Sequence, residues 1–124
     1  MVLSLAFSLY GIPRTAFNPD ESRWIHRAHY LGALRDPFGP TWDDQYLTRG
    51  QPPLGSIMTG LGLVLQGRDL TTNGSWDFDY DAATNAELGN MPSTDDLQTA
   101  RRTSAMLVAL TVAAVYLIGT RVTN

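Results

Sequence analysis

The sequence predicts a mainly α-helical, membrane-associated fold, and two stretches without charged residues indicate it. Residues 103–120 (TSAMLVALTVAAVYLIGT) form an 18-residue uncharged run between Arg101-Arg102 and Arg121. This is about the length at which an α-helix crosses a hydrocarbon core of roughly 30 Å. Residues 1–13 are also uncharged and apolar but too short to span, and they lack the basic start and cleavage site of a signal peptide. We therefore expect the end of a first transmembrane helix at 1–13 and a second at 103–120. The alternative is a buried core helix at each end of a soluble protein.

Composition limits the possible functions. The 124 residues suffice for one small domain, and the absence of cysteine excludes disulfides and thiolate metal sites. A net charge of -3 provides no basic surface for nucleic acid. The sequence predicts no nucleic-acid partner.

Between the two apolar stretches, residues 14–102 are expected to form a polar loop that contains two short helices. The first, over about 19–34, begins at Asn18-Pro19-Asp20-Glu21. Asparagine is a favoured cap, proline suits the first helical position, and a glutamate three residues after the cap completes a capping box. Acidic residues in a first turn are also stabilised by the helix dipole. Apolar residues then recur at helical spacing (Trp24, Ala28, Leu31).

The second short helix is expected over about 53–66, after Gln51-Pro52-Pro53. Its apolar residues form one stripe, and Gly67 is placed to end it. A helix with so thin a polar face favours an apolar neighbour or the membrane interface, and its glycines indicate close packing. The stripe comprises Leu54, Ile57, Met58, Leu61 and Leu65.

Residues 42–50 and 68–96 are expected to be irregular, and the second of these segments is acidic. It contains Asn73-Gly74-Ser75, formally an acceptor triplet for N-glycosylation. Ser93-Thr94-Asp95-Asp96 then supplies a helix start for the second span.

The order of these motifs resembles that of the dolichyl- or polyprenyl-phosphate-mannose–protein mannosyltransferases, multi-spanning membrane glycosyltransferases of the GT-C type. An acidic pair follows a first membrane helix, Q-P-P-L-G opens an apolar helix, G-R-D and W-D-F follow, and an arginine precedes a second membrane helix. The resemblance extends from about Phe17 to Val122. It implies an integral membrane protein whose residues 14–102 form the first extracytoplasmic loop. It also implies transfer of a sugar, expected to be mannose, from a polyprenyl-phosphate donor to a protein Ser/Thr hydroxyl. A related bacterial GT-C enzyme that modifies a lipid is the alternative within this class.

Residue by residue, the resemblance assigns Asp20 as the catalytic base and Glu21 as its orienting or metal-assisting neighbour. Arg101, with Arg102 as a register-shifted alternative, matches the arginine expected at the donor phosphate. Gln51, Pro52 and Pro53 match a substrate-binding His-Pro-Pro motif, in which glutamine here replaces histidine. A second departure is Ser56, which stands where the closest relatives have lysine. These departures leave the sugar and the acceptor open.

The chemistry fits these residue types. Transfer to a hydroxyl needs a base for its proton, and a carboxylate at a helix N-terminus can act as one. An arginine placed bidentately on the leaving phosphate would stabilise its developing charge. A single displacement inverts the anomeric centre and needs only one carboxylate. Without the resemblance, Asp20 and Glu21 are a helix cap, and Arg101 is an interfacial anchor.

Other candidates are weaker. His26 and His29 have a spacing that can hold a metal, but no third ligand is evident, so we predict ordinary polar contacts and no metal site. Dependence on a divalent metal stays open. Four aromatic residues fit either sugar stacking or membrane-interface anchoring: Trp24, Trp42, Tyr46 and Trp76.

A GT-C enzyme needs more membrane helices than this chain provides. We therefore expect the 124 residues to be the N-terminal fragment of such an enzyme and to be inactive alone. The competing hypothesis is a complete, small, non-enzymatic membrane protein whose loop binds a partner or a lipid headgroup.

Overall fold

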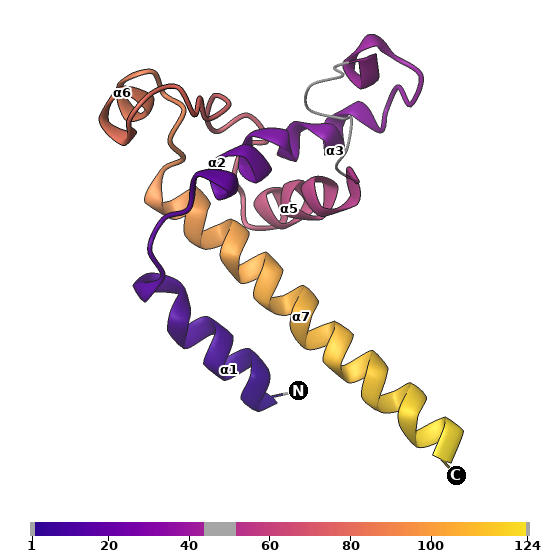
Figure 1. The fold of residues 1–124 in the computed structure, drawn as a ribbon. Coiled ribbons are helices and arrows are strands. Elements are labelled where there is room, and N and C mark those ends of the chain that lie inside the picture. The colour runs from indigo at the N-terminus through magenta and orange to yellow at the C-terminus, as the bar shows by residue number, and fades with distance from the viewer. Residues whose placement is uncertain (1, 44–51, 124) are drawn as a thin grey trace.

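All regular secondary structure in residues 2–43 and 52–123, the part of the chain that the computed structural model describes, is helical. Helix α1 (Val2–Gly11) leads into a head formed by residues 12–43, residues 52–93 and the start of helix α7 (Thr94–Thr123), and the rest of α7 leaves it. The two helices lie side by side and antiparallel, so the C-terminal end of α1 and the N-terminal end of α7 both lie at the head (Figure 1). The mainly α-helical prediction is confirmed.

Helix α7 is one continuous element of 30 residues, about 45 Å long at 1.5 Å per residue. Its start agrees with the prediction, because the backbone N–H of Asp96 donates to Ser93 Oγ at 3.1 Å. By length and composition it is able to cross a membrane. Nine large apolar side chains after Arg102 are exposed: Met106, Val108, Leu110, Val112, Val115, Tyr116, Leu117, Ile118 and Val122.

The helix expected over about 19–34 occurs as three consecutive pieces. These are α2 (Pro19–His26), the 3-10 turn η2 (Arg27–His29) and α3 (Tyr30–Ala33). The tighter turn coincides with the segment against which α5 packs, and Ala28 is completely buried there. The conformation of this segment therefore depends on its packing against α5 as well as on its helix propensity.

Helix α5 (Leu54–Leu65) buries the face opposite to its apolar stripe. Its buried residues are Ser56, Thr59, Gly60, Gly62 and Leu63. Leu54, Leu61 and Leu65 of the stripe are exposed, by 39% or more. A Cβ atom at Gly62 would collide with the side chain of Thr103 on α7, so only glycine permits this approach. The close packing predicted from the glycines is present, and the apolar stripe is left outside.

The end of α5 follows the predicted glycine stop. Gly67 has φ of 72°, a left-handed conformation that suits glycine. The N–H groups of Gly67 and Arg68 donate to the carbonyls of Val64 and Leu63, at 3.0 and 2.9 Å, which is a Schellman motif. Arg68 then pairs with Asp96 at the start of α7 (Nε to Oδ1, 2.6 Å).

The acidic segment between α5 and α7 contains a short helix that the sequence analysis missed, α6 (Ala82–Glu87), capped by Asp81. Its fully buried Asn85 accepts from the N–H of Asp77 at 2.9 Å and donates to the carbonyl of Asp77 at 2.8 Å. The Asn85 side chain therefore provides hydrogen-bond partners for the backbone N–H and carbonyl of Asp77, which the irregular loop does not provide.

Asn73, the asparagine of the glycosylation triplet, is buried. Its Nδ2 donates to the Ser22 carbonyl and Oγ at 3.2 and 3.0 Å. In the folded chain this amide therefore acts as a link between the loop and α2 and is not presented as a glycan acceptor.

Residues 40–43, at the start of the expected loop, form the 3-10 helix η3 (Pro40–Asp43), and residues 44–51 lie outside the described part of the chain. The apolar core of the head is small. Ile25, Ala28, Leu63 and Ala100 form it, with Leu97 packed against them. It lies where α2, η2, α5 and α7 meet.

Gly62→Ala tests the close approach of α5 to α7. The new methyl group must displace Thr103, and overpacking of this kind costs about 1–3 kcal/mol. Thermal unfolding in detergent should show a lowered midpoint. Gly119→Ala is the matched control, because a Cβ at Gly119 meets open space. Equal midpoints for the two variants would contradict the packing.

Candidate functional site

The N-terminus of α2 has the predicted cap. Asn18 Oδ1 accepts from the N–H of Asp20 at 3.0 Å, and Glu21 Oε2 accepts from the N–H of Asn18 at 3.0 Å. Pro19 occupies the first helical position. This capping box is complete and fixes both acidic residues at the start of the helix.

Arg101 of α7 pairs bidentately with Glu21. Nε donates to Oε1 and Nη2 to Oε2, each at 2.7 Å. Nη1 also donates to the carbonyls of Ile12 and Thr15, at 3.0 and 2.9 Å, and Nη2 donates to that of Ala16 at 2.9 Å. A guanidinium has five N–H donors, and each one is engaged here. We call this set of contacts the Arg101 clamp.

The Arg101 clamp joins three segments that are distant in sequence: the connector after α1, the start of α2 and the first third of α7. Both side chains of the ion pair are largely buried, with 12% of Arg101 and 28% of Glu21 exposed. Burial alone would raise the pKa of Glu21. The hydrogen bonds from Arg101 and Asn18 and the arginine charge outweigh it, so the pKa lies below the ordinary value of 4.5. Glu21 is therefore held as a carboxylate with three donors on it.

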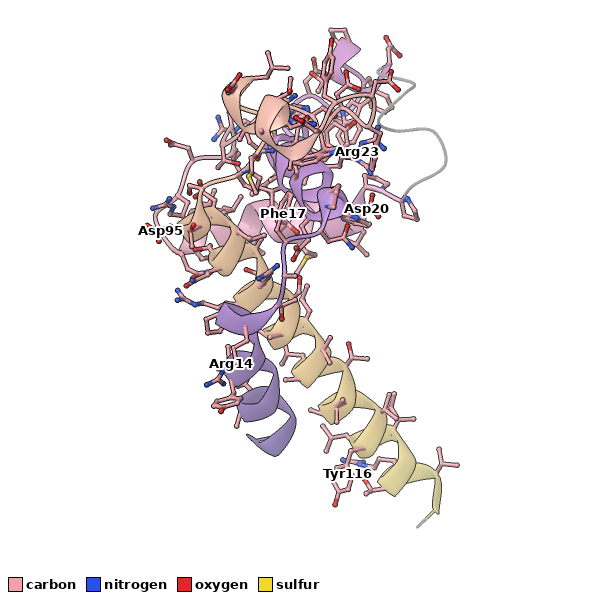
Figure 2. All side chains as sticks on the ribbon, turned by 60° about the vertical axis from the view of Figure 1, so that its left-hand side comes forward. Arg14, Phe17, Asp20, Arg23, Asp95 and Tyr116 are labelled. Atoms are coloured by element: carbon pink, nitrogen blue, oxygen red, sulfur yellow. The ribbon has the colours of Figure 1, made fainter. Side chains whose placement is uncertain are left out.

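Asp20 differs from its neighbour. It is exposed, and in the described part of the chain its carboxylate forms no hydrogen bond or ion pair. Figure 2 shows it on the head, well away from Tyr116 near the far end of α7. Of the two acidic residues, Asp20 is the one whose carboxylate has no hydrogen-bond or ion-pair partner in the described part of the chain.

Beside Glu21 lies a cavity of about 540 Å³ between α2, α5 and α7, and Asp20 is not among the residues that line it. Glu21 and Arg101 lie on its wall, and most other lining residues are apolar or small. Trp24, which is 37% exposed, also lines it. The sequence analysis did not anticipate this cavity, because its walls come from helices that pair only in the fold.

Arg102 lies apart from the acidic pair. It is exposed and lines a different groove, and its Nη2 donates to Gln98 Oε1 at 3.3 Å. Consecutive helix residues point about 100° apart, so Arg101 and Arg102 cannot face the same site.

The three substrate-binding candidates at 51–53 are only partly described. Gln51 lies outside the described residues. Pro52 and Pro53 are exposed, and Pro53 caps α5. Gly55, two positions further on, lines the cavity beside Glu21, so the start of α5 lies near the acidic pair.

Two of the aromatic candidates are already packed against other rings. Trp76 is buried, with its ring 5.3 Å from that of Phe17. Trp42 lies 5.4 Å from Tyr30 and donates through Nε1 to a backbone carbonyl. Tyr46 lies outside the described residues. Trp24 is therefore the best placed of the candidates for contact with a ligand.

The two histidines make polar contacts with the backbone. Nδ1 of His26 meets the Asn73 carbonyl at 2.8 Å, and Nδ1 of His29 meets the His26 carbonyl at 2.7 Å. A carbonyl only accepts, so each Nδ1 carries the proton. Within the described ranges, no group of three or more His, Asp or Glu is placed to hold a metal.

The pairing of Glu21 with Arg101 was also not predicted. The two residues are 80 positions apart. No local pattern links them, and the carbonyl partners of the clamp have no sequence signature at all. Two sequence features could have indicated this ion pair. They are the acidic first turn of the helix that begins at Asn18 and the arginine just before the uncharged run 103–120.

Searches against family models, curated proteins and solved structures give no match to this chain.

Removal of the charge at Glu21 should destabilise the head. Glu21→Gln leaves the Arg101 guanidinium without its carboxylate, and breaking a buried pair from one side costs about 3–5 kcal/mol. We expect about 2–4 kcal/mol, because the pair is partly exposed. Asp20→Asn is the matched control and should cost less than about 1 kcal/mol, the contribution of the helix dipole. Denaturant unfolding in detergent measures both, and equal losses would contradict the clamp.

The clamp also predicts a pH dependence. Because the folded-state pKa of Glu21 is lowered, its contribution is fully present above the ordinary pKa of 4.5 and is lost as pH falls through the lowered value. The difference in unfolding free energy between the native chain and Glu21→Gln should stay constant from pH 7 to about pH 5. It should shrink at lower pH. A difference that vanished above pH 5 would contradict the assignment.

Proposed function

We propose that this chain is the base-bearing part of a membrane glycosyltransferase that transfers a sugar from a polyprenyl-phosphate donor to a hydroxyl acceptor. The observation that carries the proposal is the contrast within the acidic pair. Asp20 is exposed and unpaired in the described part of the chain, whereas Glu21 is fixed by Arg101. An accessible carboxylate in a fixed position is what general-base catalysis requires.

In this proposal Asp20 accepts the proton of the acceptor hydroxyl. The hydroxyl oxygen forms a bond to the anomeric carbon while the bond from that carbon to the phosphate oxygen breaks. The polyprenyl phosphate leaves with the electron pair, and the anomeric centre is inverted. Glu21 is a positioning residue, because its oxygens are engaged by Arg101 and Asn18.

In this proposal Arg101 has two candidate roles, which are positioning Glu21 and binding the donor phosphate. Its five donors are engaged, so a donor phosphate can bind it only by replacing one of the carbonyls of Ile12, Thr15 or Ala16. The cavity beside it is mostly apolar and could hold the first part of a prenyl chain. We therefore assign Arg101 first to positioning, and to phosphate binding only through such an exchange.

The proposed membrane location rests on the exposed apolar surface of α7 and on the antiparallel pairing of α1 with α7. With both helices in the bilayer, the head and the exposed Asp20 lie at one surface (Figure 2). We place that surface on the extracytoplasmic face, by resemblance to the mannosyltransferases.

A non-enzymatic role is the second candidate, and the saturation of Arg101 favours it. If the clamp is purely structural, Asp20 is a first-turn acid with a small effect on stability. The two candidates differ in what happens when Asp20 alone is changed.

The test is sugar transfer in membranes that contain the full-length enzyme of which this chain is proposed to be a part. Labelled polyprenyl-phosphate-mannose is the donor, a Ser/Thr-rich peptide is the acceptor, and activity is normalised to protein abundance. Asp20→Asn should lower the rate at least 100-fold without loss of protein, since general-base catalysis contributes roughly 10²–10⁴-fold. Asp95→Asn, an exposed first-turn acid of α7, is the matched control and should stay within twofold. Full activity of Asp20→Asn in the full-length enzyme, or no transfer by the unmutated full-length enzyme, would favour the non-enzymatic role.

A further inference from the structure

The face of α5 that points away from the core borders a second groove. This groove lies between α1, α5 and α7 and has a volume of about 560 Å³. Its walls are almost wholly apolar and include Leu9, Met58, Leu61, Leu65, Met106 and Leu110. The volume is within the range of ligand pockets, about 300–1,000 Å³. The outward apolar stripe of α5 therefore forms one wall of an elongated apolar site.

The groove has a polar end. Gln66 and Arg102 border both the groove and a smaller polar pocket, which Arg68, Asp95, Gln98 and Thr99 complete. An apolar trough that ends in amide and guanidinium groups has the polarity of a lipid, with a hydrocarbon chain on one side and a headgroup on the other.

Charge at the polar end decides which headgroup fits. Arg68 is neutralised by Asp96 (Nε to Oδ1, 2.6 Å) and by Asp95 (Nη1 to Oδ2, 3.9 Å). Arg102 donates to the neutral amide of Gln98, and it has no carboxylate partner among residues 2–43 and 52–123. Two arginines and two aspartates surround the polar end, so its net charge is zero. Both aspartates pair with Arg68, which leaves the Arg102 guanidinium as the group that can donate to an anion.

The depth of Arg102 also fits a headgroup. It directly precedes the uncharged run 103–120, so with α7 in a bilayer it lies at the level of the lipid phosphates. Its aliphatic stem borders the apolar groove while its guanidinium reaches the polar pocket.

From these observations we propose that the groove binds one chain of an anionic glycerophospholipid of the surrounding bilayer, with its phosphate on Arg102 and Gln98. Basic pockets between membrane helices bind anionic headgroups in this way. The site is separate from the acidic pair, because Arg101 and Arg102 face different cavities. The inference depends on membrane insertion of α7 and not on transferase activity.

The test is native mass spectrometry of the full 124-residue chain in detergent, titrated with phosphatidylglycerol or phosphatidylcholine. The native chain should bind one phosphatidylglycerol at least fivefold more tightly than phosphatidylcholine, a preference that one interfacial arginine can supply. Arg102→Gln should lose this preference. Arg121→Gln, at the far end of the same helix, is the matched control and should retain it. An unchanged preference in Arg102→Gln, or an equal loss in both variants, would overturn the proposal.

A second variant separates the groove from the charge. Leu61→Trp narrows the groove and should weaken both lipids equally while the preference remains. Circular dichroism establishes that each variant is folded, and Arg102→Lys, which keeps the charge, should retain most of the preference. Displacement of the lipid by millimolar inorganic phosphate would show that the phosphate group alone binds. This would overturn the proposal that the apolar groove holds a lipid chain. A dimer without bound lipid would show that a second copy occupies the groove, and this too would overturn the proposal.

Discussion

The bidentate pair between Glu21 and Arg101 is the interaction on which the head depends. A buried ion pair contributes little net stability if any of its polar atoms lack partners, because taking two charges from water is costly. Here both carboxylate oxygens and all five guanidinium N–H groups are engaged. The arginine also satisfies carbonyls of the connector 12–16, which has few regular backbone partners of its own. One side chain thus fixes the position of α1 relative to both α2 and α7.

Polar contacts carry much of the organisation because the apolar core is small. Four buried side chains form it, and several of the largest apolar residues of α5 and α7 face outward. In water this arrangement would leave hydrocarbon exposed along both helices. In a bilayer the same arrangement is favourable, since lipid covers the apolar stripe and small residues allow α5 and α7 to approach closely. The outward apolar face of α5 is therefore consistent with the length and apolarity of α7, which suffice to cross a membrane.

Local signals in the sequence predicted local features well. The capping box at Asn18, the glycine stop at Gly67 and the serine start of α7 each depend on residues within four positions of one another, and each is present. Long-range features were not predictable in this way. The 3-10 turn at Arg27–His29 coincides with the contact with α5, and the partners of Arg101 are 80 or more residues away. The helix α6 was missed because its cap, Asp81, stands among other acidic residues that read as a loop.

The same reasoning explains why adjacent carboxylates can have different roles. A base must be reached by the molecule from which it takes a proton, and it must keep a lone pair free for that proton. Glu21 is the less suitable of the two, because three N–H donors from Arg101 and Asn18 already occupy its oxygens and the ion pair disfavours its protonation. Asp20 is held in the same helical turn by the same cap but remains exposed. The fixed position of Glu21 thus gives Asp20 a defined position as well, which is why the proposed base is Asp20 and not its neighbour.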